Sequence, residues 1–288
     1  MLKIKEEELK TILPPDGPSI SEVKKYLEKY NDEYIVIKCG GSVLLDQKLF
    51  DIFIKDITTL NKLGFIPIIV HGGGKRISSK LSELGIKSKF INGLRVTDKE
   101  TMKIVEQELI KFNEEIVDAL KQQSCSSQSI NSKKDNFISV VKENDELGFV
   151  GTPVKINKAI IDKIVNDKKV PVIAPLGLDE NNQTYNINAD TAAGSIAKKI
   201  KARRLIIMSD VEGVLNKNKE LITEINADSI KNLINNKTIT GGMIPKINNC
   251  LDVACNGVKG VVIIDGRKNH SILFELLSEK GSGTLIRQ

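Results

Sequence analysis

The sequence predicts an α/β fold, a three-layer αβα sandwich around a mainly parallel open sheet. Two observations predict it. Short β-branched runs alternate with helical patterns, and the runs carry few polar residues, as strands buried on both faces of a sheet do. The runs are YIVIK, IPIIV, FISVV, VPVIA, RLIIM and VVIID, at 34–38, 66–70, 137–141, 170–174, 204–208 and 261–265. The helical patterns lie at about 47–63, 75–84, 98–122, 190–201, 244–256 and 270–279.

A charged N-terminal segment precedes the first strand. Residues 1–18 end in PPDGP, and the following SISEVKKYLEKY, at 19–30, predicts a short amphipathic helix. Ser19 and Glu22 have capping-box spacing, and apolar residues of this stretch fall on one helical face. The helix either packs on its own domain or docks on another subunit, and the pattern alone leaves both open.

Two later stretches depart from the alternation of strands and helices. ENDELGFVGTPVKIN, at 143–157, places turn residues between short extended pieces and predicts a β-ribbon. QQSCSSQSINSKKDN, at 122–136, is a long polar stretch and predicts a surface loop.

Composition indicates a soluble, cytoplasmic globular protein. The 288 residues are 40% hydrophobic and 28% charged, with a net charge of +6, which is ordinary for a chain that can bury a sizeable core. Lysines are scattered among acidic residues and Trp is absent, so neither a basic stripe nor a stacking platform for nucleic acid is predicted. The N-terminus has no apolar signal-like core, and no apolar run reaches the length of about 18 residues that a membrane helix needs.

Cysteine and histidine usage argues against a zinc site. The four cysteines share no C-x-x-C spacing, and there are only two histidines. Free buried thiols in a reducing compartment are therefore expected.

Unusual residues stand at the carboxyl ends of the predicted strands, where open α/β sheets bind their ligands. Lys38 completes an apolar strand, and its ammonium group needs water, a carboxylate or a phosphate. Gly40 and Gly41 follow it and offer backbone N–H groups to an anion. After the second strand comes IVHGGGKRI, at 69–77, whose three glycines suggest that backbone approaches another group closely. His71 in this turn is interpreted as structural rather than as a ligand.

More polar residues follow the later strands. Asp190 leads into an Ala-rich helix, a polar turn lies at 209–213, and Lys246 follows a Gly-Gly pair. Asp190 alone is most simply a helix N-cap. Together with Lys38, these residues suit phosphoryl transfer, which needs positioning and charge neutralisation rather than a protein nucleophile. No G-x-x-x-x-G-K-[ST] or G-x-G-x-x-G motif is present, so spacing alone predicts a phosphotransferase-like anion site of another design.

Five motifs, in order, resemble the amino acid kinase family, and within it the arginine-sensitive kinases of N-acetyl-L-glutamate. They are IVHGGGKRI, NGLRVTD at 92–98, YNINADTAAG at 185–194, SDVEGVL at 209–215 and GGMIPKINNCLDVACNGV at 241–258. The resemblance implies ATP-dependent phosphorylation of the γ-carboxylate of N-acetyl-L-glutamate, the second step of arginine biosynthesis. It also implies an N-terminal extension at 1–30 and a kinase domain at 31–288, with an acyl-amino-acid lobe at about 31–180 and an ATP lobe at about 181–288.

The resemblance implies a role for each matching residue. Lys38 and Lys246 would stabilise charge on the transferring phosphoryl group, and Asp190 would organise both lysines. Arg95 would pair with the α-carboxylate of the substrate, whose geometry suits a bidentate guanidinium. The further implied ligands are Gly73, Gly74 and Asn186 for the substrate, and Gly41, Ser209, Asp210 and Leu215 for ATP. Mg²⁺ would be held mainly by the ATP phosphates, so no dedicated metal ligands are expected.

A second resemblance concerns regulation. Arginine-inhibited members carry an N-terminal helix and a C-terminal signature like GRKNHSILFELLSEKGSGTLI, at 266–286. The likeness implies an L-arginine pocket formed with His270, Glu275 and Gly281. It also implies that the helix containing Tyr26 joins dimers into a hexamer, a trimer of dimers. A PII-type signalling protein is a possible further partner on which the sequence is silent.

Other interpretations stay open. Aspartate, glutamate, carbamate and uridylate kinases are the nearest rivals, and NGLRVTD argues against them, whereas a kinase of aminoadipate derivatives is harder to separate. A catalytically idle arginine sensor is the alternative from another class, and the charges of Lys38, Asp190 and Lys246 argue against it. NSKKDN, at 131–136, departs from the family pattern and leaves the local conformation there open.

Overall fold

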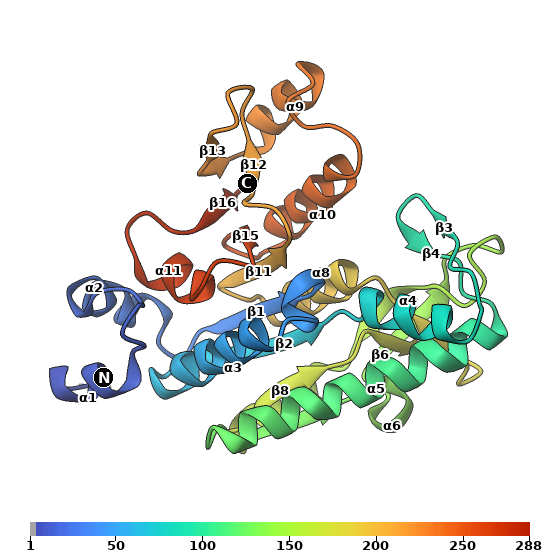
Figure 1. Ribbon diagram of the computed structural model, residues 1–288, viewed down its shortest axis with the longest axis horizontal. Helices are drawn as coiled ribbons and strands as arrows, with labels where there is room; N and C mark the ends of the chain where they lie inside the picture. Colours follow the sequence, from blue (N-terminus) through green and yellow to red (C-terminus); the bar gives the residue numbers. More distant parts are fainter. Residues whose placement is uncertain (1–3) are drawn as a thin grey trace.

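An eight-stranded sheet runs through the centre of the computed structural model, in the strand order β14-β16-β15-β11-β1-β2-β8-β5 (Figure 1). The structure describes residues 4–288, apart from the side chains of Ser42 and Leu44. Neighbouring strands are parallel, except for the antiparallel pair β15 and β16. The strands are β1 (Tyr34–Cys39), β2 (Ile66–His71), β5 (Ser127–Ile130), β8 (Val170–Ile173), β11 (Arg204–Ser209), β14 (Glu224–Ile225), β15 (Val261–Asp265) and β16 (Gly283–Ile286). The predicted open, mainly parallel sheet is confirmed.

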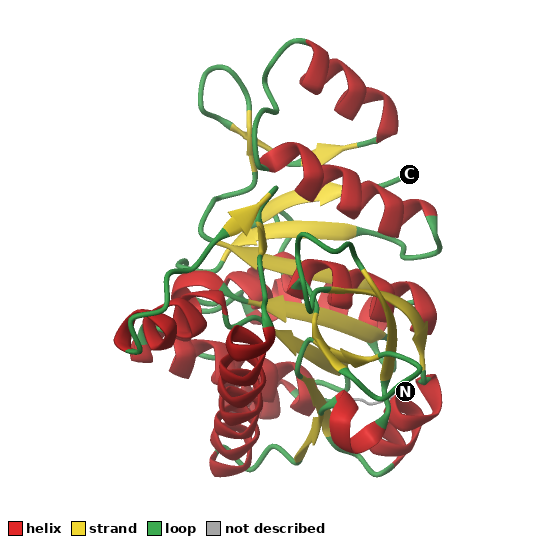
Figure 2. Ribbon diagram, turned by 90° about the vertical axis from the view of Figure 1, so that its right-hand side faces the viewer, coloured by secondary structure: helices red, strands yellow, loops and turns green. Residues whose placement is uncertain are grey.

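Helices cover both faces of this sheet (Figure 2), because side chains alternate along each strand. In β1, Val36 belongs to the apolar cluster of one face, whereas Ile35 and Ile37 belong to that of the other. The first cluster is covered by α7 (Lys158–Asn166), α8 (Ala189–Ile200), α9 (Ala227–Asn235) and α10 (Met243–Cys255). The second is covered by α3 (Gln47–Lys62), α5 (Lys99–Gln122) and α11 (Ser271–Leu277). This is the predicted αβα sandwich.

A smaller four-stranded sheet has the order β10-β9-β6-β7. Its strands are β6 (Ile138–Lys142), β7 (Gly151–Ile156), β9 (Leu176–Leu178) and β10 (Thr184–Asn186). The run at 137–141 therefore forms a strand, as predicted, but one outside the central sheet. It pairs antiparallel with β7. The β-ribbon predicted at 143–157 is therefore only partly correct: this stretch supplies the strand β7, whose partner β6 lies before it. Two short hairpins, β3 (Phe90–Ile91) with β4 (Leu94–Arg95) and β12 (Val214–Leu215) with β13 (Leu221–Ile222), complete the strands.

The surface loop predicted at 122–136 is wrong. This stretch contains β5, which pairs with β8 at one edge of the central sheet, and the short helix α6 (Ser132–Asp135). An edge strand has a neighbour on one side only, so it tolerates the Ser and Gln side chains that a central strand would exclude. The polarity of the stretch marks the edge of the sheet rather than a loop.

The N-terminal extension forms two helices, α1 (Glu6–Ile12) and α2 (Ile20–Tyr30), near α3 and α11 (Figure 1). Its first three residues lie outside the described part of the chain. The capping box predicted for Ser19 and Glu22 is present. Leu9 and Val23 are fully buried in the cluster that α3 also fills. The extension therefore packs on its own domain, and docking of the helix on another subunit stays a prediction.

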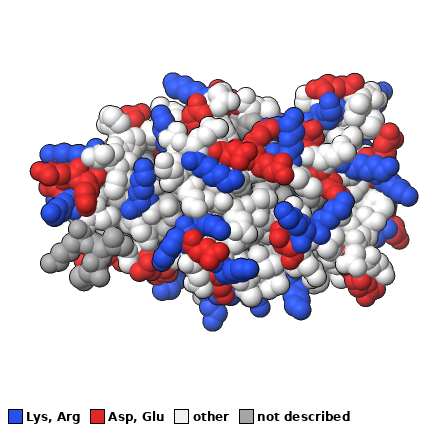
Figure 3. Space-filling view, turned by 90° about the horizontal axis from the view of Figure 1, so that it is seen from below, with Lys and Arg blue, Asp and Glu red and all other residues white. Residues whose placement is uncertain are grey.

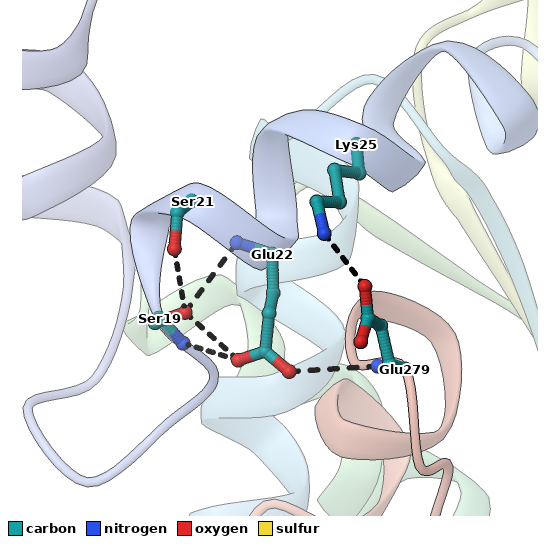
Figure 4. A network of polar contacts seen from close by, with 5 residues as sticks. All are labelled: Ser19, Ser21, Glu22, Lys25 and Glu279. Carbon is teal, nitrogen blue, oxygen red and sulfur yellow. Dashed lines mark hydrogen bonds and ion pairs between the residues drawn. The ribbon is translucent and has the colours of Figure 1, made fainter.

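Polar contacts join α2 to the C-terminal segment (Figure 4). Lys25 Nζ lies 2.6 Å from Glu279 Oε1, and the backbone N–H of Glu279 donates to Glu22 Oε1 at 3.5 Å. These groups are exposed, so the contacts add little stability. They nevertheless place α2 against the chain that follows α11.

The surface carries both signs of charge. The face in Figure 3 mixes Lys and Arg with Asp and Glu, and it has no stripe of one sign. Among the described residues, no helix is long and apolar enough to cross a membrane.

Candidate active site

A cavity of about 580 Å³ opens at the carboxyl ends of β1 and β2. These strands are parallel neighbours, with Lys38 opposite Val70 and Cys39 opposite His71, so the loops that follow them meet at one edge of the sheet. The predicted site residues that line this cavity are Lys38, Gly41, Gly73, Gly74, Arg95, Asn186 and Asp190. The structure therefore brings together residues from the predicted phosphate and substrate sites.

Asp190 holds both predicted catalytic lysines. Its Oδ1 lies 2.9 Å from Lys38 Nζ, and its Oδ2 accepts from Lys246 Nζ at 2.9 Å. Burial alone raises the pKa of Asp190, but the charges and hydrogen bonds of the two lysines more than offset it and lower the pKa to about 2. The carboxylate is therefore ionised at neutral pH.

The N-cap interpretation of Asp190 is wrong. Asn188 is the N-cap of α8, and its side chain accepts from the backbone N–H groups of Asp190 and Thr191. The Asp190 side chain, in the first turn of the helix, is thereby left for the lysines. Its negative charge also lies at the positive end of the α8 dipole, which favours the ionised form.

The glycines after β1 are required by their neighbours. A Cβ on Gly40 would lie 2.8 Å from Lys38 Nζ, so Gly40 leaves room for the ammonium group. Gly41 has a φ of +65°, and a Cβ there would lie 2.5 Å from Asp210 Oδ1. Gly40 therefore avoids a steric contact, whereas Gly41 avoids a steric contact and also adopts a left-handed backbone conformation that favours glycine.

The triple-glycine turn leads into α4 (Gly74–Glu83), and its glycines also differ in what they require. A Cβ on Gly73 would lie 2.7 Å from Leu109 Cδ2, whereas no described atom beyond the chain neighbours and the nearby helix backbone lies within 4 Å of the corresponding position on Gly74. Gly73 therefore packs against α5, and Gly74 faces open space on the cavity wall. The close approach of backbone that the sequence suggested is available at Gly74.

His71 is a structural residue, as interpreted from the sequence. Its Nδ1 donates to the carbonyl of Gly72 at 2.9 Å, and its Nε2 accepts from Asn113 Nδ2 at 3.1 Å. Asn113 also donates to the carbonyl of Val172. Burial lowers the pKa of His71 to about 4, so the ring is neutral. Asn113 holds the ring in place, and the ring in turn holds the carbonyl of Gly72 in the glycine turn.

Arg95 is 6% exposed and lies on β4. It donates to Ser88 Oγ at 2.6 Å, to Ser78 Oγ at 2.8 Å and to the carbonyl of Gly74 at 2.9 Å, and it stacks on Phe90. Within the described residues it forms no ion pair with a carboxylate. A buried guanidinium on a cavity wall, held by neutral groups, is suited to receive an anionic ligand.

Of the other predicted ligands, Asn186 lines this cavity, whereas Ser209, Asp210 and Leu215 do not. Asn186 Nδ2 donates to Thr97 Oγ1 at 3.4 Å, which joins β10 to the NGLRVTD segment. Ser209 ends β11, the neighbour of β1, and Asp210 follows it beside Gly41. Of the residues expected at ATP, only Gly41 lines the cavity; Leu215 lies in the β12–β13 hairpin.

The residues expected at the arginine pocket are only partly brought together. A second cavity, of about 830 Å³, is lined by Tyr26, Glu275 and Gly281. Burial raises the pKa of Glu275, which accepts from the backbone N–H of Ser282. His270 does not line this cavity.

The His270 ring is held elsewhere. Its Nδ1 lies 2.5 Å from Asp56 Oδ1 on α3, and its Nε2 lies 3.1 Å from Asp16 Oδ1 in the N-terminal extension. The hydrogen bond with Asp56 raises the pKa of His270. In this structure His270 therefore joins three parts of the chain rather than facing the second cavity.

No metal-binding cluster of three or more His, Cys, Asp or Glu side chains exists among the described residues. Asp190 has both carboxylate oxygens engaged by lysines.

Sequence reasoning missed several residues of the site. Lys75 lines the cavity and pairs with Asp210 at 3.0 Å, and its position directly after the three glycines could have identified it. Ser78 stands one turn later on the same helix. Ser88 contacts Arg95 seven residues later and Asn113 contacts His71 42 residues earlier, and neither residue belongs to a recognisable motif.

A model of the amino acid kinase family matches residues 33–265, most of the chain. The chain belongs to the amino acid kinase family. It is 67% identical over 288 residues to the acetylglutamate kinase of Pelagibacter ubique (strain HTCC1062), with 100% of both chains covered. It is 45% identical over 264 residues to that of Campylobacter fetus subsp. fetus, covering 91% of this chain and 94% of the relative. This family member is thus a kinase by sequence relationship.

Solved structures agree on the family fold. N-acetylglutamate synthase from Neisseria gonorrhoeae matches with a TM-score of 0.84 at 21% identity over 94% of this chain, which spans 64% of that longer structure. Carbamate kinase from Giardia lamblia matches with a TM-score of 0.64 at 15% identity, covering 89% of this chain and 99% of that one. At such identities the likeness concerns the fold alone.

Proposed function

We propose that this kinase transfers the γ-phosphoryl group of ATP to the γ-carboxylate of N-acetyl-L-glutamate, in arginine biosynthesis. The observation that carries the proposal is the Asp190 carboxylate, which holds Lys38 and Lys246 at 2.9 Å each beside a cavity that Arg95 also lines. The names of the relatives at 67% and 45% identity support the choice of substrate.

Two lysines at one carboxylate supply fixed positive charge for the transferring group. As negative charge develops on the phosphoryl oxygens, ammonium groups already held in place stabilise it without reorganisation. Gly41 offers a backbone N–H at the same turn, and Ser209, Asp210 and Leu215 are proposed to border the nucleotide. Magnesium on the phosphates would neutralise further charge.

Arg95 is proposed to pair with the α-carboxylate of the acyl-amino acid, with Gly73, Gly74 and Asn186 along the same wall. Arg95 and Lys38 both line one cavity, so a substrate anchored at one end by the guanidinium reaches the lysines with its other carboxylate. This anchoring converts binding energy into alignment of the nucleophile.

No general base is needed for this reaction. The attacking carboxylate has a reference pKa of about 4.3 and is already ionised near neutral pH. His71 is buried, neutral and committed to Gly72 and Asn113. The absence of a base role for His71 thus agrees with the proposed chemistry.

A coupled assay of ADP release tests the proposal. N-acetyl-L-glutamate, L-glutamate, L-aspartate and N-acetyl-L-aminoadipate are compared as acceptors with MgATP. Turnover confined to N-acetyl-L-glutamate supports the assignment, and turnover with the aminoadipate derivative alone replaces it. ATP binding with no turnover on any acceptor supports the idle arginine sensor.

We further propose feedback inhibition by L-arginine at the second cavity, with Tyr26 and Glu275 among its ligands. A partly buried carboxylate beside a polar cavity suits the guanidinium of arginine. The hexameric assembly, the PII-type partner, the cytoplasmic location and the lobes at about 31–180 and 181–288 stay predictions. Arginine added to the assay, with the mass of the assembly measured by light scattering, separates inhibition from oligomer formation.

A further inference from the structure

Lys75 stands where its charge is locally unfavourable. Lys75 is in the first turn of α4, and Arg76 follows it. This first turn contains no acidic residue. The N-terminal end of a helix carries partial positive charge, so a cation there is destabilised. Arg76 is compensated by Glu115, with two hydrogen bonds of 2.6 and 2.8 Å, and it stacks on Phe112.

Lys75 instead reaches across the end of the sheet. Its Nζ lies 3.0 Å from Asp210 Oδ2. Lys75 follows β2 and Asp210 follows β11, and β1 lies between these two strands. The contact therefore passes over the Gly40–Gly41 turn at the end of β1. Both side chains are substantially exposed, at 48% and 39%, so as an ion pair alone it stabilises the fold little.

The Asp210 carboxylate lies directly against the Gly40–Gly41 turn. A Cβ on Gly41 would come within 2.5 Å of Oδ1 and 3.0 Å of Oδ2. An anionic group thus sits beside the glycine proposed to contact a nucleotide phosphate, and Lys75 is bonded to that anionic group. A phosphate oxygen at Gly41 would meet the same ammonium.

The charges around the Gly40–Gly41 turn bear on how a nucleotide would bind there. Lys38 and Lys246 share the single Asp190 carboxylate, so the three groups together carry one net positive charge. A triphosphate brings several negative charges, and an ammonium in direct contact with a phosphate oxygen stabilises it locally, although Lys75 and Asp210 together add no net charge to the site.

We propose that Lys75 binds the β- and γ-phosphates of ATP, and that its ammonium moves from Asp210 to a phosphate oxygen when the nucleotide binds. The proposal rests on the proposed kinase function and deepens it by adding a third cation to the nucleotide site.

Calorimetric titration of the full-length chain with MgATP, MgADP and AMP, without an acyl substrate, tests the proposal. Lys75→Met is expected to weaken ATP about tenfold, the loss of one charge-assisted contact, to weaken ADP less and to leave AMP unchanged. Lys75→Arg should retain most of the affinity. The matched control is Lys80→Met, on the same helix, with a side chain 43% exposed and paired to Glu83. Equal losses for all three nucleotides, or none, overturn the proposal.

A double-variant comparison excludes an indirect effect. If Lys75→Met acted only by leaving the Asp210 charge unpaired beside the phosphates, it would have no effect in an Asp210→Asn background. The proposal requires the ATP-specific loss to persist there, and thermal melting of each variant reports folding. If the wild-type chain binds ATP but does not phosphorylate N-acetyl-L-glutamate, the proposed substrate fails while these titrations still decide the role of Lys75.

Discussion

Asp190→Asn is the perturbation that most directly tests the site. The change keeps the shape of the side chain and removes its charge, so Lys38 and Lys246, with side chains only 11% and 22% exposed, lose their common partner and repel each other. The pKa of Asp190 falls from 3.8 to about 2 on folding, which by linkage amounts to about 2 kcal/mol of stability at neutral pH. With the lysine repulsion added, the free energy of unfolding should fall by about 2 to 4 kcal/mol.

The pH dependence of this loss has a definite sign. Because the folded-state pKa of Asp190 lies below the unfolded value of 3.8, its stabilisation is fully present above about pH 4 and disappears as the pH falls toward 2. The difference in stability between wild type and Asp190→Asn should therefore be constant from pH 7 to about 4 and shrink below that. Urea unfolding followed by circular dichroism measures it.

Asp190→Asn should lower kcat more than it weakens nucleotide binding. Asp190 orients the two lysines, so kcat in the ADP-release assay should fall about a hundredfold or more, whereas the KM for ATP should not rise, because the net positive charge of the site increases. Asp252→Asn, which breaks an exposed contact of Asp252 with Lys198, is the control, with a stability change below about 1 kcal/mol. Asp190→Asn with near-normal kcat and stability would refute the reasoning.

Three further outcomes are expected. Arg95→Lys, which cannot reproduce the guanidinium fork, should raise the KM for N-acetyl-L-glutamate at least about tenfold and leave that for ATP nearly unchanged in the same assay. Leu9→Ala should lower the free energy of unfolding by about 2 to 4 kcal/mol in urea titrations, because Leu9 is fully buried; an unchanged value would mean that α1 is not docked. Asp56 raises the pKa of His270 above 6.5, so the stabilisation is complete below pH 6.5 and is lost as the pH rises through the raised value. Protection of the amides at residues 6–12, measured as the intrinsic exchange rate at each pH divided by the observed rate, should therefore fall between pH 6 and 8 in wild type, but not in His270→Asn.

Local sequence patterns located most of the main strands and helices and most of the strand-end residues, although they missed β5, α7 and α9. The β-branched runs and helical periods are local properties, so they located the main strands and helices within one or two residues. The capping box at Ser19 and Glu22 is also a local feature, and it is present as predicted. Lys38 and the glycine turns were visible because they break an apolar pattern at the edge where parallel strands bind ligands.

Which of these residues come into contact depends on the tertiary structure. Lys246 and Asp190 are 56 positions apart, and their contact depends on how α8 and α10 pack on one face of the sheet. The same holds for β5, whose polar residues form a strand only because β8 offers them an edge, and for the ring of His270, which turns toward Asp56. Sequence patterns report the environment of each residue relative to its own helix or strand, whereas contacts between elements follow from strand order, and strand order is set by the packing of the whole chain.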